Sequence, residues 1–241
     1  MGLSDNVSYT YNPNAERGNR IVDIKINGES VDPDKDYTVA ASTFLLDGGD
    51  ALINKDEVRD RNDVGYNDLQ AFVDYLQSGE AKVRAGQKDV GVVLPEGGLK
   101  AGQKNTITLT SLSYSSEGEP KATTVTAKLG ETEATAKVDN EVTDADKGLG
   151  EQGRATVELD IPAGVSGEQT LNITTDAGTN VSLPVTVDGE GETGSPTGKA
   201  TDARLGIILG VIAAVLALIL PLVFAFEIDA VLGPIARINP R

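Results

Sequence analysis

The chain has 241 residues, 37 of them acidic and 21 basic, with a formal net charge of −16 at pH 7, and it contains neither His nor Cys. The missing His excludes His-dependent acid–base chemistry, and the missing Cys excludes thiol nucleophiles, disulfides and Cys-ligated zinc. Because an anionic chain repels phosphate backbones, we expect no nucleic-acid partner.

Residues 1–87 have the pattern of a mixed α and β domain. Apolar and polar residues alternate in Ile21–Ile26, which is typical of a strand. Asn27-Gly28 follows it and is a strong signal for a hairpin turn. Tyr37–Ala41 reads as a further strand. These signals predict short strands joined by tight turns.

A helix is expected from about Asp68. Asn67 and Gln70 resemble a capping box at its start, and Gly79 supplies the stop. Its apolar residues fall at i, i+3, i+4 and i+7, which predicts a stripe packed in a core. The stripe consists of Leu69, Phe72, Val73 and Leu76.

Between the second strand and this helix, an aromatic ring, a double glycine and a carboxylate occur within seven residues, Phe44–Asp50. Phe44 is placed where a strand ends and the Gly48-Gly49 turn begins, so the backbone can approach a ligand closely. Asp50 would then face the same pocket. The alternative is that Phe44 is a core aromatic and Gly48-Gly49-Asp50 an ordinary turn.

The order and spacing of several motifs resemble the C-terminal domain of bacterial cell-surface 5′-nucleotidases, the bifunctional metallophosphatase/5′-nucleotidase family. The resemblance covers roughly residues 2–87 and begins mid-domain, so the chain reads as an N-terminally truncated part of a longer enzyme. The motifs are Ser8–Tyr11, Arg20–Val22, Asn27-Gly28, Asp32–Tyr37 and Phe44–Asp50.

The resemblance assigns a substrate-binding role to Phe44, Gly48, Gly49 and Asp50. Phe44 is expected to stack on the nucleobase, and Asp50 to accept hydrogen bonds from the ribose hydroxyls. The family's second stacking aromatic and its metal-binding domain lie upstream of the matched part. We therefore expect no catalytic residue and no metal site in this chain. Divalent metal ions are expected in the missing catalytic domain, and the chain alone is expected to be inactive.

Two acidic segments partly resemble calcium-binding loops. Asp32, Asp34 and Asp36 alternate, but the Gly and Glu of a calcium loop do not follow, and in 143–148 Lys147 replaces an oxygen ligand. Solvated turns are the favoured interpretation of both.

From residue 88 to 188 the pattern changes to short strands separated by turns, which predicts an all-β, Ig-like sandwich. Its expected strands include Asn105–Leu109, Thr123–Ala127, Ala155–Leu159, Thr170–Thr174 and Val181–Val185. No catalytic constellation is visible in this half, so a spacer or contact surface is expected.

The C-terminal part predicts a single-pass membrane anchor. Residues 189–204 read as a flexible linker, and 205–226 are uncharged and long enough to cross a bilayer as a helix. Residues 227–241 would form a short cytoplasmic tail. The family context places the folded domains outside the cell membrane.

Taken together, these features predict a nucleoside-recognising, membrane-anchoring C-terminal part of an enzyme that hydrolyses nucleoside 5′-phosphates to nucleosides and phosphate. The expected partners are a nucleotide or nucleoside, the membrane and a separately encoded metallophosphatase half. The alternative is a non-enzymatic surface stalk or adhesion protein.

Overall fold

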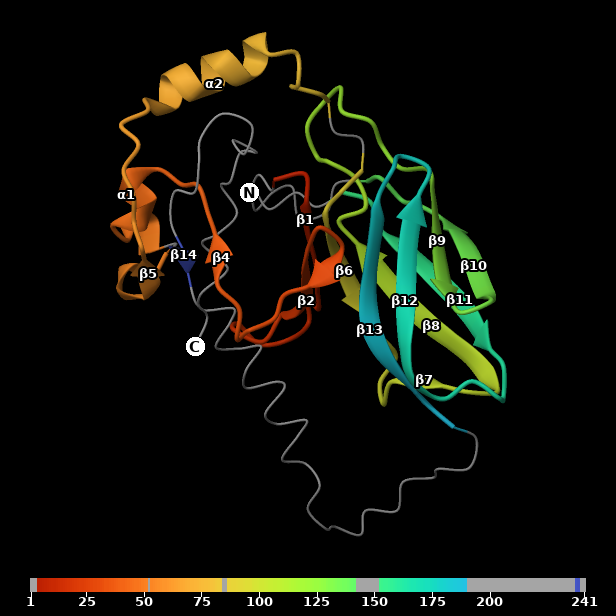
Figure 1. Ribbon diagram of the computed structural model, residues 1–241. Coiled ribbons are helices and arrows are strands. Elements are labelled where there is room, and N and C mark those ends of the chain that lie inside the picture. Colours follow the sequence, from red (N-terminus) through yellow and green to blue (C-terminus); the bar gives the residue numbers. More distant parts are fainter. Residues whose placement is uncertain (1–3, 52, 84–85, 142–151, 190–236, 239–241) are drawn as a thin grey trace. The chain divides into compact units, whose positions relative to one another are not determined.

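The computed structural model describes residues 4–51, 53–83, 86–141, 152–189 and 237–238 (Figure 1). The chain divides into two compact units. The first comprises Met1–Val7, Lys25–Val83 and Thr201–Arg241, and the second comprises Ser8–Ile24 and Arg84–Ala200. Residues 8–24 therefore belong with the predicted sandwich and not with the residues that follow them.

Two sheets contain most of the strands, and these strands lie in the second unit except for β3 and the ends of β1 and β2. One sheet has the order β11-β8-β6-β1-β2-β3 and the other has the order β10-β9-β12-β13-β7. The strands are β1 (Val7–Tyr11), β2 (Ile21–Ile26), β3 (Glu29–Ser30), β6 (Asp89–Val93), β7 (Leu99–Lys100), β8 (Gln103–Thr110), β9 (Thr124–Leu129), β10 (Thr132–Lys137), β11 (Ala155–Ile161), β12 (Gly167–Thr175) and β13 (Asn180–Asp188).

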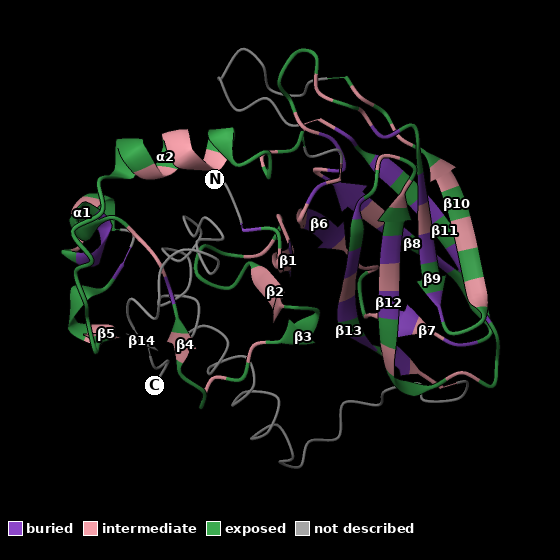
Figure 2. Ribbon diagram, turned by 45° about the horizontal axis from the view of Figure 1, so that its top comes forward, coloured by how far each residue is buried: buried purple, intermediate pink, exposed green. Residues whose placement is uncertain are grey.

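Alternating burial along these strands builds one core between the two sheets. In β11 every second residue is buried, as Figure 2 shows by its purple and green bands. This is the pattern of a sandwich strand with one face on the core. The buried cluster draws on both sheets, with Ile107, Leu109, Val157 and Leu159 from one and Val125, Leu129, Leu171 and Ile173 from the other. The predicted β-rich half is thus confirmed as a sandwich of two sheets.

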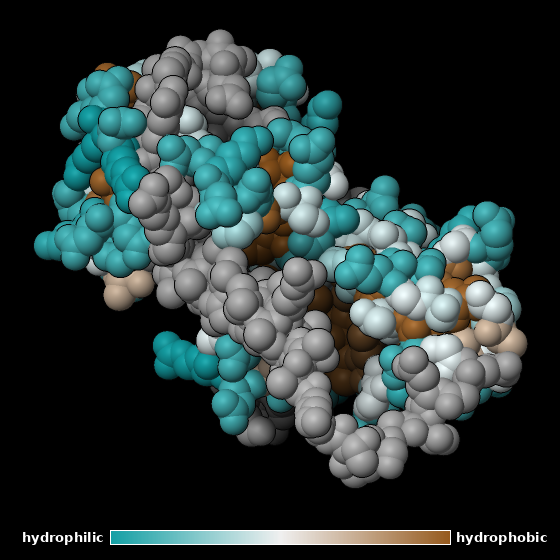
Figure 3. Space-filling model, turned by 60° about the horizontal axis from the view of Figure 1, so that its bottom comes forward, coloured by the Kyte–Doolittle hydropathy of each residue, from teal (hydrophilic) through white to brown (hydrophobic). Residues whose placement is uncertain are grey.

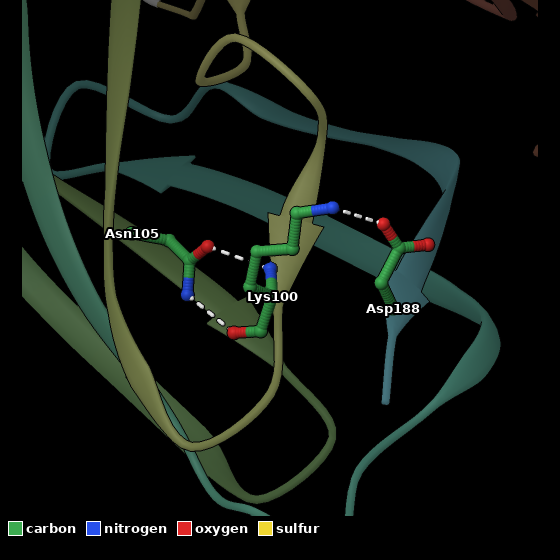
Figure 4. A network of polar contacts seen from close by, with 3 residues as sticks. All are labelled: Lys100, Asn105 and Asp188. Carbon is green, nitrogen blue, oxygen red and sulfur yellow. Dashed lines mark hydrogen bonds and ion pairs between the residues drawn. The ribbon is translucent and has the colours of Figure 1, made fainter. Parts of the chain in front are cut away.

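A buried asparagine fixes one corner of this sandwich (Figure 4). The Asn105 side-chain oxygen accepts a hydrogen bond from the Lys100 backbone N–H at 2.8 Å, and its amide nitrogen donates to the Lys100 carbonyl, also at 2.8 Å. The Lys100 ammonium pairs with Asp188 at the end of β13. The network satisfies polar groups that would otherwise be costly to bury.

Two pairs of strands are parallel, which the sequence pattern did not predict. β7 pairs with the end of β13, and β1 pairs with β6 through Tyr9 opposite Asp89 and Tyr11 opposite Gly91. The Tyr11 and Ser111 hydroxyls lie 2.7 Å apart. These contacts hold β1 on the edge of β6.

The first unit is small and mixed. Its core cluster consists of Leu45, Leu46 and Ile53, with Ala41 and Val58 packed against it. A three-stranded sheet has the order β4-β14-β5. The elements are β4 (Tyr37–Thr38), α1 (Thr43–Leu46), β5 (Val58–Arg59), α2 (Asp68–Gln77) and β14 (Arg237–Ile238), with 3₁₀ turns at Gly49–Ala51 and Lys55–Glu57.

The structure confirms several local predictions for residues 21–41 and corrects one. β2 has the predicted bounds, and Asn27 and Gly28 take φ values of 56° and 82°, as a tight hairpin turn requires. The strand predicted over Tyr37–Ala41 is shorter, since β4 ends at Thr38.

The α2 helix begins and ends where predicted, but its apolar stripe is not buried. Asn67 accepts hydrogen bonds from the Leu69 and Gln70 backbone N–H groups, and Gly79 follows the helix with φ 78°. Leu69, Phe72 and Leu76 are exposed. The prediction that this stripe packs in a core is therefore wrong.

The predicted linker and membrane span lie outside the described residues. Among the residues that are described, no helix is long and apolar enough to cross a membrane. Of the predicted tail, the structure describes only Arg237–Ile238, which pair with β4 and β5.

Replacing Gly91 by Ala is expected to destabilise the sandwich. A Cβ on Gly91 would collide with Thr110 Oγ1 and lie 3.2 Å from Tyr11 Cζ. Overpacking of this kind costs about 1–3 kcal/mol, which lowers the urea midpoint of unfolding. Gly164→Ala is the matched control, because nothing lies within 4 Å of its Cβ. Equal midpoints for the two variants would contradict the tight packing at Gly91.

The half-buried carboxyl of Asp89 predicts a pH dependence of stability. Burial raises the pKa of Asp89, and burial together with the Asp89 charge raises the pKa of Tyr9, whose hydroxyl donates to Asp89 at 3.4 Å. With its pKa raised on folding, Asp89 holds its proton more tightly in the folded state. Its contribution to the free energy of unfolding is therefore fully present below about pH 4 and is lost as pH rises through the folded pKa.

Asp89→Asn should remove this loss. We expect the variant to gain stability relative to wild type as pH rises from about 4 to about 7, by at most about 1.4 kcal/mol per pH unit. Urea unfolding followed by tyrosine fluorescence measures the difference. A constant difference between the two proteins over this range would show that Asp89 titrates normally.

Candidate functional site

The candidate site begins with helix α1, which contains Phe44 and leaves its side chain exposed to solvent. Ser42 caps the helix, its hydroxyl accepting from the Leu45 backbone N–H at 3.4 Å. Leu45 and Leu46 are buried in the small core of the first unit. Phe44, directly before them, points away from this core and keeps 58% of its surface exposed. The alternative interpretation, in which Phe44 is a core aromatic, is therefore wrong.

Phe44 is nevertheless held in place, because its ring lies against the backbone of Gly49. A Cβ on Gly49 would come within 2.5 Å of Phe44 Cε1 and Cζ and within 2.6 Å of the Phe44 carbonyl oxygen. No side chain fits there while the ring keeps this position, and the Phe44 carbonyl oxygen blocks the same space, so the second glycine of the motif is required by both. The backbone supports one side of the ring, and the exposed remainder is open to a planar ligand.

The turn after Phe44 runs through left-handed backbone. Gly48 has φ 87°, and Asp50 and Ala51 have φ 57° and 52°. The Gly48 and Ala51 N–H groups donate to the carbonyls of Leu45 and Gly48 at 2.9 and 3.1 Å. Left-handed conformation costs a non-glycine residue about 1–2 kcal/mol and occurs often at functional sites. Here it projects an exposed carboxylate, Asp50, from the end of the turn.

The second carboxylate of the segment is already engaged. Arg61 donates to Asp47 Oδ1 at 2.5 Å, and this hydrogen bond holds the pKa of Asp47 below its usual range. Asn54, on the other side of the turn, accepts from the Asp56 N–H and donates to Glu57. Asp47 therefore ties the turn to Arg61, whereas Asn54 caps the 3₁₀ turn Lys55–Glu57. Asp50 is exposed, as both of these residues are. Sequence reasoning missed Arg61, which is 14 residues from its partner.

The described residues contain no group of three or more Asp or Glu side chains that could hold a metal ion. Asp32 accepts a hydrogen bond from the Asp34 N–H at 2.9 Å, which is the geometry of a local turn. The other weighed calcium segment, 143–148, falls outside the described residues. The chemistry available at the Phe44 turn is thus stacking and hydrogen bonding.

Comparison with known proteins bears on this turn directly. Residues 1–55 match the family described as 5′-nucleotidase, C-terminal domain. A search of curated proteins finds no match. The matched segment contains all four predicted binding residues and ends before α2. The Phe44 turn therefore lies in the part of the chain that is similar to a 5′-nucleotidase C-terminal domain.

Proposed function

We propose that the Phe44 turn is a nucleoside-binding element of a 5′-nucleotidase, with Phe44 stacking on the base and Asp50 accepting hydrogen bonds from the ribose hydroxyls. The observation that carries this proposal is the supported, open ring of Phe44 against Gly49. A ring fixed before binding loses little conformational freedom when a base stacks on it. Hydrolysis of the 5′-phosphate would take place at a metal centre on another part of the enzyme.

The energetics of this turn favour weak binding. Stacking one base on an aromatic side chain contributes about 1–3 kcal/mol, and a hydrogen bond to a charged group adds about 1.5–3 kcal/mol. A single ring covers only one face of the base. After the cost of association, a dissociation constant of about 1 mM is expected, corresponding to about 4 kcal/mol.

The remaining parts of the chain would present this element at the cell surface. In this proposal the Ig-like sandwich is a spacer, residues 189–204 a linker and residues 205–226 a membrane anchor, with the folded units outside the cell. A single span would separate β14 from β4 and β5, so the proposal requires that this strand pairing is absent in the membrane-anchored protein. A second candidate function is a non-enzymatic surface stalk. The observation that favours it is the contrast between the extensive core of the sandwich and the small core of the first unit.

An NMR titration of the chain with adenosine tests the nucleoside site. We expect saturable shifts of the Phe44 and Asp50 signals in the millimolar range. Phe44→Leu, which keeps an apolar side chain but removes the flat ring, should weaken binding about fivefold or more, since it loses about 1 kcal/mol or more of stacking. Gly49→Ala should weaken it as well, because the new Cβ displaces the ring.

Asp50 is tested in the same titration with 2′,3′-dideoxyadenosine as a second ligand. Wild type should prefer adenosine, and Asp50→Asn should lose much of that preference because the carboxylate no longer accepts from the ribose hydroxyls. Asp56→Asn is the matched control, since Asp56 is an exposed carboxylate six residues further on. The stalk would be favoured if the folded protein showed no shifts at millimolar adenosine. It would also be favoured if Phe44→Leu bound adenosine as tightly as wild type does.

Deletion of residues 205–226 tests the proposed anchor. Wild type expressed in a bacterial host should sediment with membranes and resist extraction by sodium carbonate, whereas the deletion variant should not. Surface proteolysis of intact cells then reports on the side that the sandwich faces. Wild type that stays in the soluble fraction would overturn the anchoring part of the proposal and leave the nucleoside site untouched.

A further inference from the structure

The middle strand of the small sheet in the first unit comes from the C-terminal end of the chain. β4 and β5 each pair with β14, which lies between them (Figure 1). We call the place of β14 the central position. Without β14, the edges of β4 and β5 that face this position would carry unpaired backbone N–H and C=O groups. Edges of this kind bind an extended peptide segment through main-chain hydrogen bonds.

The register indicates which segment fits the central position. Ile238 is opposite Tyr37 and Val58, which are both half-buried. Pairs of aromatic and β-branched residues across strands are favourable. Arg237 is opposite Arg59, and like charges directly opposite each other destabilise an antiparallel pair. The central position therefore takes an apolar residue opposite Val58, and β14 pairs there with one unfavourable contact.

Backbone pairing matters here because the first unit buries few apolar side chains. The core cluster around Leu45 is small, and Val58 of β5 packs against it. In the space-filling view, hydrophobic atoms, in brown, reach the surface among hydrophilic ones (Figure 3). β5 is followed closely by Arg61, which is hydrogen-bonded to Asp47 in the Phe44 turn. Loss of β14 would thus remove support from a strand that leads to the candidate site.

A membrane span at residues 205–226 would separate β14 from the central position. A helix of this length covers about 33 Å and ends across the bilayer from the folded units. Residues 227–236 reach at most about 36 Å when fully extended, and an extended chain in lipid leaves its N–H and C=O groups unpaired. Glu227 and Asp229 would also enter the lipid. Insertion of the span and pairing of β14 therefore exclude each other.

We propose that the central position between β4 and β5 is a binding site for one extended peptide segment, which residues 237–238 fill only while residues 205–226 are outside a membrane. This inference rests on the anchoring part of the proposed function. The family match ends at residue 55, before β5 and β14, so it assigns no role to this pairing. Membrane insertion would then empty a strand-binding site in the unit that holds the Phe44 turn.

Disulfide trapping tests this directly, because the chain contains no Cys. Thr38 and Arg237 are opposite each other, and Cβ atoms of such pairs lie about 4.5–5.5 Å apart, so Thr38→Cys with Arg237→Cys should cross-link on oxidation. Tyr37→Cys with Arg237→Cys is the matched control, because side chains one residue out of register point to opposite faces of the sheet. Mobility on non-reducing gels measures the cross-linked fraction.

The full chain is synthesised in a cell-free system, once without lipid and once with lipid nanodiscs. We expect the cross-linked fraction of the in-register pair to be about tenfold lower in nanodiscs, because the two locations of residues 237–238 exclude each other. The same pair in a chain lacking residues 205–226 should cross-link with and without nanodiscs. This second variant keeps the test decisive if the full chain aggregates without lipid.

Hydrogen exchange of the otherwise unchanged chain tests the register. Without lipid, Arg237→Glu should slow exchange at residues 37–38 and 58–59 about twofold or more, because an acidic residue replaces the like charge opposite Arg59. Arg241→Glu is the matched control, since it makes the same charge change four residues further on, and it should leave these rates unchanged. Equal rates for the two variants would contradict the register.

Co-purification with nanodiscs reports insertion independently of the cross-link. A chain that enters nanodiscs and keeps the full cross-linked fraction rejects this inference and leaves the anchor in place. A chain that never enters nanodiscs rejects the anchor, and the inference with it. An in-register pair that cross-links no better than the control in either setting shows that β14 does not occupy the central position, which also overturns the proposal.

Discussion

Burial of apolar side chains between two sheets is the interaction on which the described structure depends. Residues such as Ile107, Leu159 and Ile173 are fully buried there, and alternation along the strands supplies this core without any aromatic side chain. At about 25 cal/mol per Å² of apolar surface, such a core can stabilise a unit of this size. The described residues of the first unit form only the small cluster around Leu45, Leu46 and Ile53, so the features of this unit depend on local contacts or on a partner.

The Phe44 turn shows how local contacts replace a core. The ring of Phe44 lies on the Gly49 backbone, Leu45 and Leu46 anchor the helix beneath it, and Asp47 is tied to Arg61. Each contact lies within a short stretch of chain, so the turn can form with little support from elsewhere. Local contacts cannot cover the apolar stripe of α2, because a single helix cannot bury its own apolar side chains. The same unit therefore contains a site that is formed and a surface that is left open.

Local signals in the sequence predicted local structure well. The bounds of β2, the hairpin turn at Asn27-Gly28 and the start of α2 at Asn67 each follow from a few neighbouring residues whose backbone preferences agree. The Phe44 motif also placed an aromatic residue, a glycine turn and a carboxylate in one segment. The motif did not reveal that the Phe44 ring would lie against the Gly49 backbone, where a side chain would clash.

Features that depend on residues far apart in the chain could not be predicted from the sequence. The parallel pairing of β1 with β6 joins residues some 80 positions apart, and nothing in either strand specifies the other as its neighbour. The ion pair of Asp47 with Arg61 is likewise decided by the path of the chain between them. For α2, periodicity reveals that one face is apolar but not whether anything covers it. The prediction of a packed stripe assumed a partner that the described residues do not supply.

The proposed nucleoside site depends on the position of the Phe44 ring, and NOE spectroscopy of the free chain tests this position most directly. The Gly49 α-protons should show NOEs to the Phe44 ring protons and a ring-current shift that disappears in Phe44→Leu. On addition of adenosine, the base protons should show NOEs to the same ring. Gly49 α-protons with neither an NOE nor a ring-current shift would mean that the ring is not held against the backbone, and the nucleoside site would lose its physical basis.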